Sequence, residues 1–231
     1  MSRLIIHAPQ RSAVSLPCMH RYFIKTPWLV KKCFPRYTWS IPPTANEVYL
    51  TFDDGPHPTI TPWVLEQLEP YNAKATFFCI GDNVVRYPDT YRRLIAEGHS
   101  VGNHTQNHLN GWNVPPATYI DNIRQAATHI HSSLFRPPYG RIRPASVPGI
   151  RSLLGEHVQI IMWDVLSADF DPAFRPEHCL NNVLANTVAG SIIVFHDSEK
   201  AFPNLKFILP RVLEDLSRRG YQFKRIEERV G

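Results

Sequence analysis

The sequence predicts an α/β protein that folds as one closed or nearly closed barrel of parallel strands. Short apolar runs rich in β-branched and aromatic residues alternate with segments of helical period, which is typical of a parallel sheet joined by helices. The chain has 231 residues with 43% hydrophobic content, and no Gly/Ser-rich linker separates two halves. One domain is therefore favoured. Six or seven strand–helix units within one domain indicate a barrel more than an open sheet.

The predicted elements follow in order along the chain. Residues 1–45, rich in Pro and aromatics, are predicted to form an irregular arm that covers part of the core. Beyond the arm, the predicted strands are residues 48–52, 75–80, 99–103, 158–163, 191–195 and 221–223.

Helices are predicted between these strands. The first opens with Thr61 as N-cap and Pro62 at the first helical position. Gly98 and Gly220 are suited to end two of the others. The remaining predicted helices are residues 88–98, 116–134, 176–188 and 205–219.

The charge pattern excludes a dedicated nucleic-acid-binding domain. The net charge is +5 and the isoelectric point is about 9.1, but no basic face or binding motif is visible. The longest basic stretch contains Lys25, Lys31, Lys32 and Arg36 with aromatics interleaved. It could contact an acidic polymer or a membrane surface. An ordinary solvated segment is favoured, because charge runs are usually solvated.

The four cysteines, Cys18, Cys33, Cys79 and Cys179, are far apart and show no Cys-x-x-Cys spacing. This excludes a zinc ribbon and a disulfide framework, and Cys79 in an apolar run is predicted to be a free buried thiol. No apolar stretch is long enough to span a bilayer, so no stable membrane insertion is expected. Residues 9–11 interrupt any secretory leader. The prediction is a cytoplasmic protein, with export or a later start at Met19 left open.

Two adjacent carboxylates stand where the first predicted strand ends. The sequence TFDDG at residues 51–55 places Asp53 and Asp54 before a Gly-Pro turn. Adjacent side chains at a strand end point to opposite faces. One carboxylate could therefore hold a cation while its neighbour handles a proton. The tripeptide alone favours a solvated turn, because short motifs often mislead.

His104 and His108 are four residues apart, which predicts that both imidazoles lie on one face of a helical turn. The pair alone is weak, because a chain with 11 histidines often contains one such spacing by chance. With Asp54 it makes three ligands and leaves a position open, the arrangement of a catalytic metal site.

Polar residues recur at the predicted carboxyl ends of the strands, where parallel barrels gather their reactive groups. Those residues are Asp53, Asp54, His104, Asp164, His196 and Asp197. Asp164 is interpreted as satisfying strand-end N–H groups rather than as a partner of the site. Asp197 is interpreted as a turn or orienting residue.

Four motifs together resemble the polysaccharide deacetylases, the NodB-homology family or carbohydrate esterase family four. They are TFDDG at 51–55, HTQNH at 104–108, RPPYG at 136–140 and IIVFHD at 192–197, in the family's order. The resemblance implies a distorted (β/α) barrel of about seven strands over residues 46–228. It also implies a divalent metal, usually zinc, and hydrolysis of N-acetyl or O-acetyl groups on glycans.

Each site residue carries a role that the resemblance implies. Asp54, His104 and His108 match the metal ligands, with zinc expected and cobalt or another first-row divalent as alternatives. Asp53 matches the general base and His196 the general acid. The positioning and stabilising groups are Arg136, which orients the base, Asp169, which pairs with His196, and Tyr139, whose backbone N–H donates to the oxyanion.

The family's own fourth motif, which falls at residues 163–170 between RPPYG and IIVFHD, departs from its usual pattern. Phe170 stands where the family usually has Trp, and Leu166 stands where a second Asp is common. Val194 replaces the usual Leu. Asp169 is kept, so we expect the departure to affect the groove wall and substrate preference rather than the reaction type.

Other conspicuous residues receive weaker assignments. Trp112 and Tyr139 could stack on sugar rings or could pack inside the protein. His99 is expected to be structural.

The expected function is a metal-dependent hydrolase that removes acetyl groups from a glycan, with no nucleic-acid partner. Two alternatives stay open. One is a non-catalytic glycan-binding relative whose altered fourth motif has removed activity, and the other is an amidase for a small non-carbohydrate substrate. The sequence does not predict the particular glycan or the oligomeric state.

Overall fold

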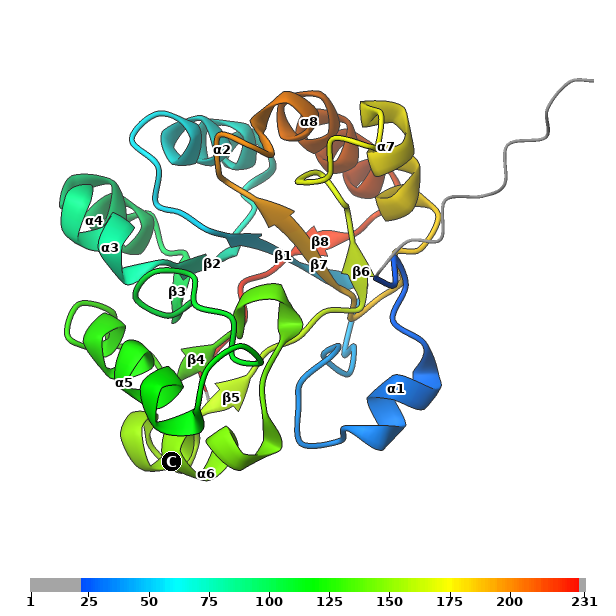
Figure 1. The fold of residues 1–231 in the computed structure, drawn as a ribbon. Helices are drawn as coiled ribbons and strands as arrows, with labels where there is room; N and C mark the ends of the chain where they lie inside the picture. The colour runs from blue at the N-terminus through cyan, green and yellow to red at the C-terminus, as the bar shows by residue number, and fades with distance from the viewer. Residues whose placement is uncertain (1–21, 229–231) are drawn as a thin grey trace, which may run out of the picture.

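Residues 22–228 are described by the structure, a computed structural model, and they form a curled parallel sheet surrounded by helices (Figure 1). The strand order is β5-β4-β3-β2-β1-β7-β6, and β8 pairs with β1 off this path. All of these pairings are parallel. The predicted distorted (β/α) barrel is therefore confirmed.

The two longest strands lie side by side at the centre of the sheet. They are β1 (Glu47–Asp53) and β7 (Ile192–His196). Phe52 stacks against Phe77 and Phe195 from the neighbouring strands, with ring centroids 5.0 and 5.6 Å away. The other strands are β2 (Thr76–Cys79), β3 (Ser100–Asn103), β4 (Leu134–Phe135), β5 (Gln159–Ile160), β6 (Val165–Leu166) and β8 (Gln222–Phe223).

Helices cover the outside of the sheet. Pro88, Pro116 and Pro176 each begin one, at the position where a missing N–H costs nothing. The helices are α1 (Trp28–Cys33), α2 (Ile60–Leu68), α3 (Gly81–Arg86), α4 (Pro88–Ala96), α5 (Pro116–Ala127), α6 (Val147–Leu154), α7 (Pro176–Leu184) and α8 (Phe202–Arg218).

The amino-terminal arm lies in the gap between β5 and β6, the two ends of the strand path. On one side the Leu166 N–H donates to the carbonyl of Ile24 at 2.8 Å. On the other, the Thr38 N–H donates to the carbonyl of Ile160 at 2.9 Å, and Met162 donates back to Thr38 at 2.7 Å. The arm thus supplies backbone hydrogen-bond partners to the outer sides of β5 and β6, where neither strand has a neighbouring strand in the sheet.

Asp164 anchors this arm at the amino-terminal mouth of the barrel. Its carboxylate accepts from Lys25 at 2.6 Å, Lys31 at 2.5 Å and Ser191 at 2.6 Å. Burial raises the pKa of Asp164, but these three donors outweigh burial and lower it. The prediction that Asp164 ends a strand at the reactive mouth is wrong, because it precedes β6 and lies at the opposite end.

Several predicted boundaries also differ. Thr59, not Thr61, precedes helix α2, so Thr61 and Pro62 lie inside the first turn. The predicted helix 116–134 ends at residue 127, and its last residue belongs to β4. Strands β4 and β6 and helices α3 and α6 have no counterpart among the predicted elements. The described part of the predicted irregular arm contains helix α1.

Within residues 22–228, the structure contains no helix that is both long and apolar enough to cross a bilayer.

Candidate active site

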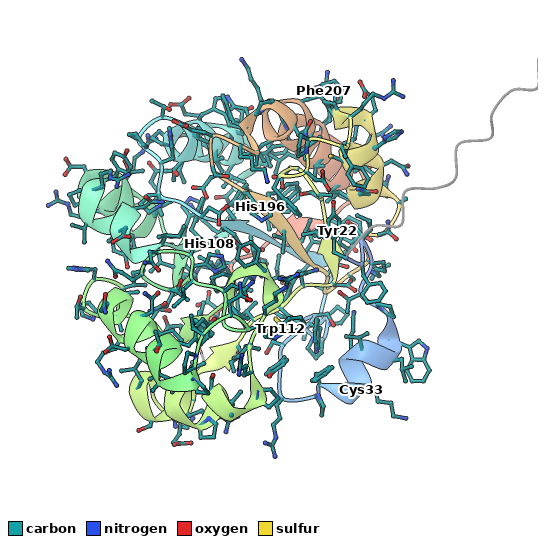
Figure 2. The ribbon with its side chains drawn as sticks, viewed as in Figure 1. Tyr22, Cys33, His108, Trp112, His196 and Phe207 are labelled. Carbon is teal, nitrogen blue, oxygen red and sulfur yellow. The ribbon has the colours of Figure 1, made fainter. Side chains whose placement is uncertain are left out.

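The carboxyl ends of the central strands bring the predicted site residues together. Asp53 and His196 are register partners at the ends of β1 and β7, so their side chains leave adjacent strands. His104 directly follows β3, and His108 lies four residues further on. In Figure 2 the labelled His108 and His196 both lie over the middle of the barrel. The reactive mouth therefore contains both predicted proton-transfer groups and both predicted imidazole ligands.

Asp54, His104 and His108 form a cluster suited to a metal ion. One ligand atom from each lies within 4.8 Å of the other two. Asp54 Oδ1 is 3.2 Å from His108 Nε2 and 3.8 Å from His104 Nε2. This oxygen is buried and has no hydrogen-bond partner among the described residues. A buried carboxylate oxygen without a donor, facing two imidazole nitrogens, fits a divalent cation.

The ring of His104 is oriented by the backbone. Its Nδ1 lies 2.7 Å from the carbonyl of Arg136, so this nitrogen carries the proton and donates it. Nε2 is left with a lone pair that faces Asp54. Burial lowers the pKa of His104 to about 4, more than the nearby carboxylates raise it, and burial likewise lowers the pKa of His108. A neutral imidazole oriented by a carbonyl is the form that ligates metal.

Left-handed backbone conformations gather around the cluster. Six non-glycine residues in the described chain have positive φ, and only Asn72 lies elsewhere. The five at the site are Asp54 (79°), Thr105 (68°), His108 (59°), Tyr139 (61°) and Ala168 (63°). Such conformations cost free energy and persist where the surrounding structure enforces them, often at functional sites.

These angles correct the predicted helical turn. Residues 104–108 form a turn rather than a helix, and left-handed residues bring the two imidazoles to a centroid distance of 5.2 Å. At Asp54 the left-handed backbone ends the alternation of the strand. Asn83 stabilises this bend, because its side-chain amide donates to the Asp54 carbonyl at 2.7 Å.

Arg136 pairs with Asp53 inside the protein. The guanidinium is fully buried and donates to Asp53 Oδ1 and Thr51 Oγ1, both at 2.7 Å. Its other N–H groups donate to the carbonyls of Ile161 and Met162. With these partners its orientation is fixed, and one face of the guanidinium lies 4.1 Å from the Phe78 ring centroid. This charge-assisted hydrogen bond holds the Asp53 carboxylate in place.

His196 pairs with Asp169. Its Nδ1 donates to Asp169 Oδ1, and its backbone N–H donates to Oδ2, both at 2.8 Å. Burial lowers the pKa of His196, but the charge and hydrogen bond of Asp169 outweigh burial and raise it to about 9. His196 is therefore protonated at neutral pH, with Nδ1 occupied by Asp169 and Nε2 left to donate.

Replacing Asp169 with Asn should move the alkaline limb of the profile of kcat/KM against pH to lower pH. The variant loses the charge that raises the pKa of His196, so the imidazolium loses its proton closer to 6.5, its ordinary value. The direction follows because activity needs the protonated form. The exposed Asp121→Asn variant serves as the control. A limb that stays in place would show that Asp169 does not set the protonation of His196.

Phe170, the departure from the family pattern, packs against the predicted acid. Its ring centroid is 4.9 Å from that of His196 and 5.5 Å from that of Tyr22, which comes from the arm. The Tyr22 hydroxyl donates to Asp171 at 2.5 Å. Sequence reasoning missed Tyr22, since nothing in the arm's sequence indicates a contact 149 residues away.

Two aromatic side chains stand exposed beside the cluster. Tyr139 is 59% exposed, with its ring 4.5 Å from that of His108, and Trp112 is 54% exposed. The Arg141 guanidinium lies 5.2 Å from the Trp112 ring and 5.9 Å from the Tyr139 ring. Both side chains therefore offer free surface near the site, which favours the stacking interpretation over the packing one.

The remaining assignments concern structural residues. His99 is buried and accepts from the Ala75 N–H at 3.1 Å, as predicted. Asp197 is buried against Gly55 and accepts from the Thr61 hydroxyl. Burial raises its pKa to about 7. Cys79 is a buried free thiol, as predicted.

Comparison with known proteins agrees with this geometry. Residues 40–154 match the polysaccharide deacetylase family. A peptidoglycan-N-acetylglucosamine deacetylase of Bacillus cereus is 34% identical over 198 residues, which cover 83% of this chain and 91% of that protein. A chitooligosaccharide deacetylase of Azorhizobium caulinodans is 36% identical over 161 residues, covering 66% and 74%. The chain spans 60% of a second Bacillus cereus peptidoglycan-N-acetylglucosamine deacetylase.

A solved structure shows the same architecture. It is the crystal structure of the Bc1960 peptidoglycan N-acetylglucosamine deacetylase in complex with 4-naphthalen-1-yl-N-oxidanyl-benzamide. The TM-score is 0.73 at 30% identity, over 83% of this chain and 91% of that one. With a metal-type cluster at the barrel mouth, a matching family model and relatives similar in sequence and fold, the chain belongs to the polysaccharide deacetylases, metal-dependent hydrolases that remove acetyl groups from glycans.

Proposed function

We propose that this chain releases acetate from N-acetylglucosamine units of peptidoglycan, with zinc held by Asp54, His104 and His108. The observation that carries the proposal is the placement of a carboxylate, Asp53, and an imidazole, His196, beside one metal-type cluster. Asp53 is paired with a cation, Arg136, and His196 with an anion, Asp169. This pairing favours a carboxylate base and an imidazolium acid in the same pocket.

The residues of the chain divide the hydrolysis of an acetamide between them. Asp53 accepts a proton from the water that attacks the acetyl carbon. His196 donates a proton from Nε2 to the nitrogen as the C–N bond breaks, which gives acetate and a free amine. A bound divalent cation would supply Lewis acidity toward the acetyl oxygen and would make water more acidic. The Tyr139 backbone N–H is assigned to the same oxygen.

Removal of N-acetyl rather than O-acetyl groups is supported by His196. An amine departs only when its nitrogen is protonated, whereas an alkoxide is a better leaving group. A histidine whose pKa is raised to about 9 stays protonated throughout neutral pH. The site therefore provides the acid that amide cleavage demands.

Peptidoglycan is proposed over other glycans because of coverage. The match covers 91% of the Bacillus cereus peptidoglycan deacetylase but 74% of the chitooligosaccharide deacetylase, at similar sequence identity. Chitooligosaccharide is the second candidate substrate, and the exposed Trp112 and Tyr139 would suit either sugar chain.

Acetate release from a panel of substrates tests the proposal. The panel contains purified peptidoglycan, N-acetylchitooligosaccharides, acetylated xylan and a small cyclic amide, each with and without chelator. We expect release from peptidoglycan that the chelator abolishes and zinc restores. Faster acetate release from chitooligosaccharides than from peptidoglycan would show that chitooligosaccharide is the better substrate. Faster turnover of the cyclic amide than of any glycan would favour the amidase alternative. Glycan binding without any acetate release would favour a non-catalytic relative.

A further inference from the structure

All of the chain's excess positive charge lies in its amino-terminal arm. Residues 1–46 contain seven of the 25 Lys and Arg residues and none of the 20 Asp and Glu residues. Residues 47–231 therefore hold 18 basic and 20 acidic side chains and are slightly acidic overall. A charge so unevenly divided indicates a function for the arm separate from that of the barrel.

The described part of the arm also exposes large apolar side chains. Trp28 is 70% exposed, Phe23 58%, Leu29 57% and Phe34 47%. No residue of helix α1 is buried. In Figure 1 helix α1 lies at the edge of the barrel, and no other helix or strand of residues 22–228 lies outside it. We call Trp28, Leu29 and Phe34, which lie in helix α1 or directly follow it, the apolar patch.

Free cations accompany the apolar patch. Lys32 and Arg36 are exposed, and neither pairs with a carboxylate in the described part of the chain. The Lys32 ammonium lies 5.7 Å from the Trp28 ring. Lys31 shares Asp164 with Lys25, so that cluster keeps an excess positive charge.

We propose that the apolar patch with Lys32 and Arg36 docks the protein on the surface of an anionic lipid bilayer. Trp, Phe and Leu beside Lys and Arg are the residues that lie at the boundary between lipid headgroups and acyl chains. The cations are attracted by anionic headgroups, and the apolar side chains leave water. An anionic polymer would use the cations but would leave Trp28 and Leu29 in water, so the lipid surface accounts for more of the patch.

The position of α1 would keep the active site free. A groove of about 1360 Å³ is lined by Lys31 and residues 35–42 of the arm. Its other lining residues include Glu47, the first residue of β1, and Lys74 and Gly98, which precede β2 and β3. This groove lies at the amino-terminal mouth of the barrel. The site residues follow the opposite ends of the strands, so docking through the arm would leave the metal cluster accessible to a glycan.

Flotation of the full-length protein with vesicles tests the proposal independently of catalysis. We expect binding at 0.15 M salt, about the physiological level, to vesicles of phosphatidylglycerol and phosphatidylcholine but not of phosphatidylcholine alone. Lys32→Gln with Arg36→Gln should weaken binding about 30-fold, since each cation near the surface contributes about fivefold. Trp28→Ser with Leu29→Ser should weaken it by about tenfold or more.

Matched variants elsewhere on the surface control for folding and charge. Val85→Ser with Ile95→Ser removes two exposed apolar groups, and Lys206→Gln with Arg211→Gln removes two exposed cations. Both should bind like the parent chain. The proposal is overturned if the parent chain does not bind the vesicles, or if the Trp28 and Leu29 variant binds them as the parent does. It is also overturned if polyphosphate displaces the parent chain fully from the vesicles while the Trp28 and Leu29 variant still binds polyphosphate.

Discussion

Asp53→Asn should lower acetate release by about 10²- to 10⁴-fold, the range that one positioned proton-transfer group contributes. The amide keeps the size of the carboxylate and still accepts a hydrogen bond from Arg136, but it cannot take a proton from water. Arg136 would face a neutral partner in a buried place, so a loss of stability of about 3 kcal/mol is also expected. Rates are therefore compared well below the unfolding midpoint of the variant.

The control for this change is metal content. Asp53 is not one of the three assigned metal ligands, whereas the carboxylate of Asp54 is and faces both imidazoles. The variant should consequently hold as much metal as the parent, measured by elemental analysis after dialysis. Turnover that survives with full metal content would show that another group accepts the proton. Lost metal would show that Asp53 belongs to the ligand set.

His108→Ala should abolish both metal retention and acetate release. The change removes one of the three ligands. Replacing a residue that only hydrogen-bonds to a ligand already lowers metal affinity by about 10- to 100-fold. The loss at His108 should exceed that range. Calorimetric titration of the metal-free parent and variant with zinc and with cobalt measures the change in metal affinity directly.

The exposed His131→Ala variant provides a matched control, since it removes a histidine outside the cluster. It should bind metal as the parent does. Chelation of the parent should reproduce the inactivity of His108→Ala, and added metal should rescue the chelated parent but not the variant at equal concentration. Unchanged affinity in His108→Ala would contradict the assigned ligand set.

The sequence predicts the class of fold because hydrophobic periodicity is a local signal. The central strands β1 and β7 and helices α4 and α7 are long enough for alternation, or for a proline start, to reveal them. Strands β4 and β6 contain two residues each, and unlike the equally short β5 and β8 neither stands out as a separate apolar run in the sequence. They exist because neighbouring strands offer backbone partners, which is a property of the assembled sheet.

The candidate site follows the same division. Asp53, Asp54 and His196 could be placed from strand ends and motifs, since the chemistry depends on residue type. The turn that joins His104 and His108 could not, because it rests on left-handed residues that local propensity disfavours. Asp164 was placed at the wrong mouth because its partners Lys25 and Lys31 are more than 130 residues away in the sequence.

The arm's hydrogen bonds to β5 and β6 bear on how the protein can be shortened. A chain trimmed to begin at the first strand would leave those two strands with bare N–H and C=O groups along a sheet rim. Such rims recruit strands from other molecules, and trimming would therefore favour self-association over solubility. The unit that folds without a bare rim is therefore larger than the barrel alone, and it includes a segment that carries none of the reactive groups.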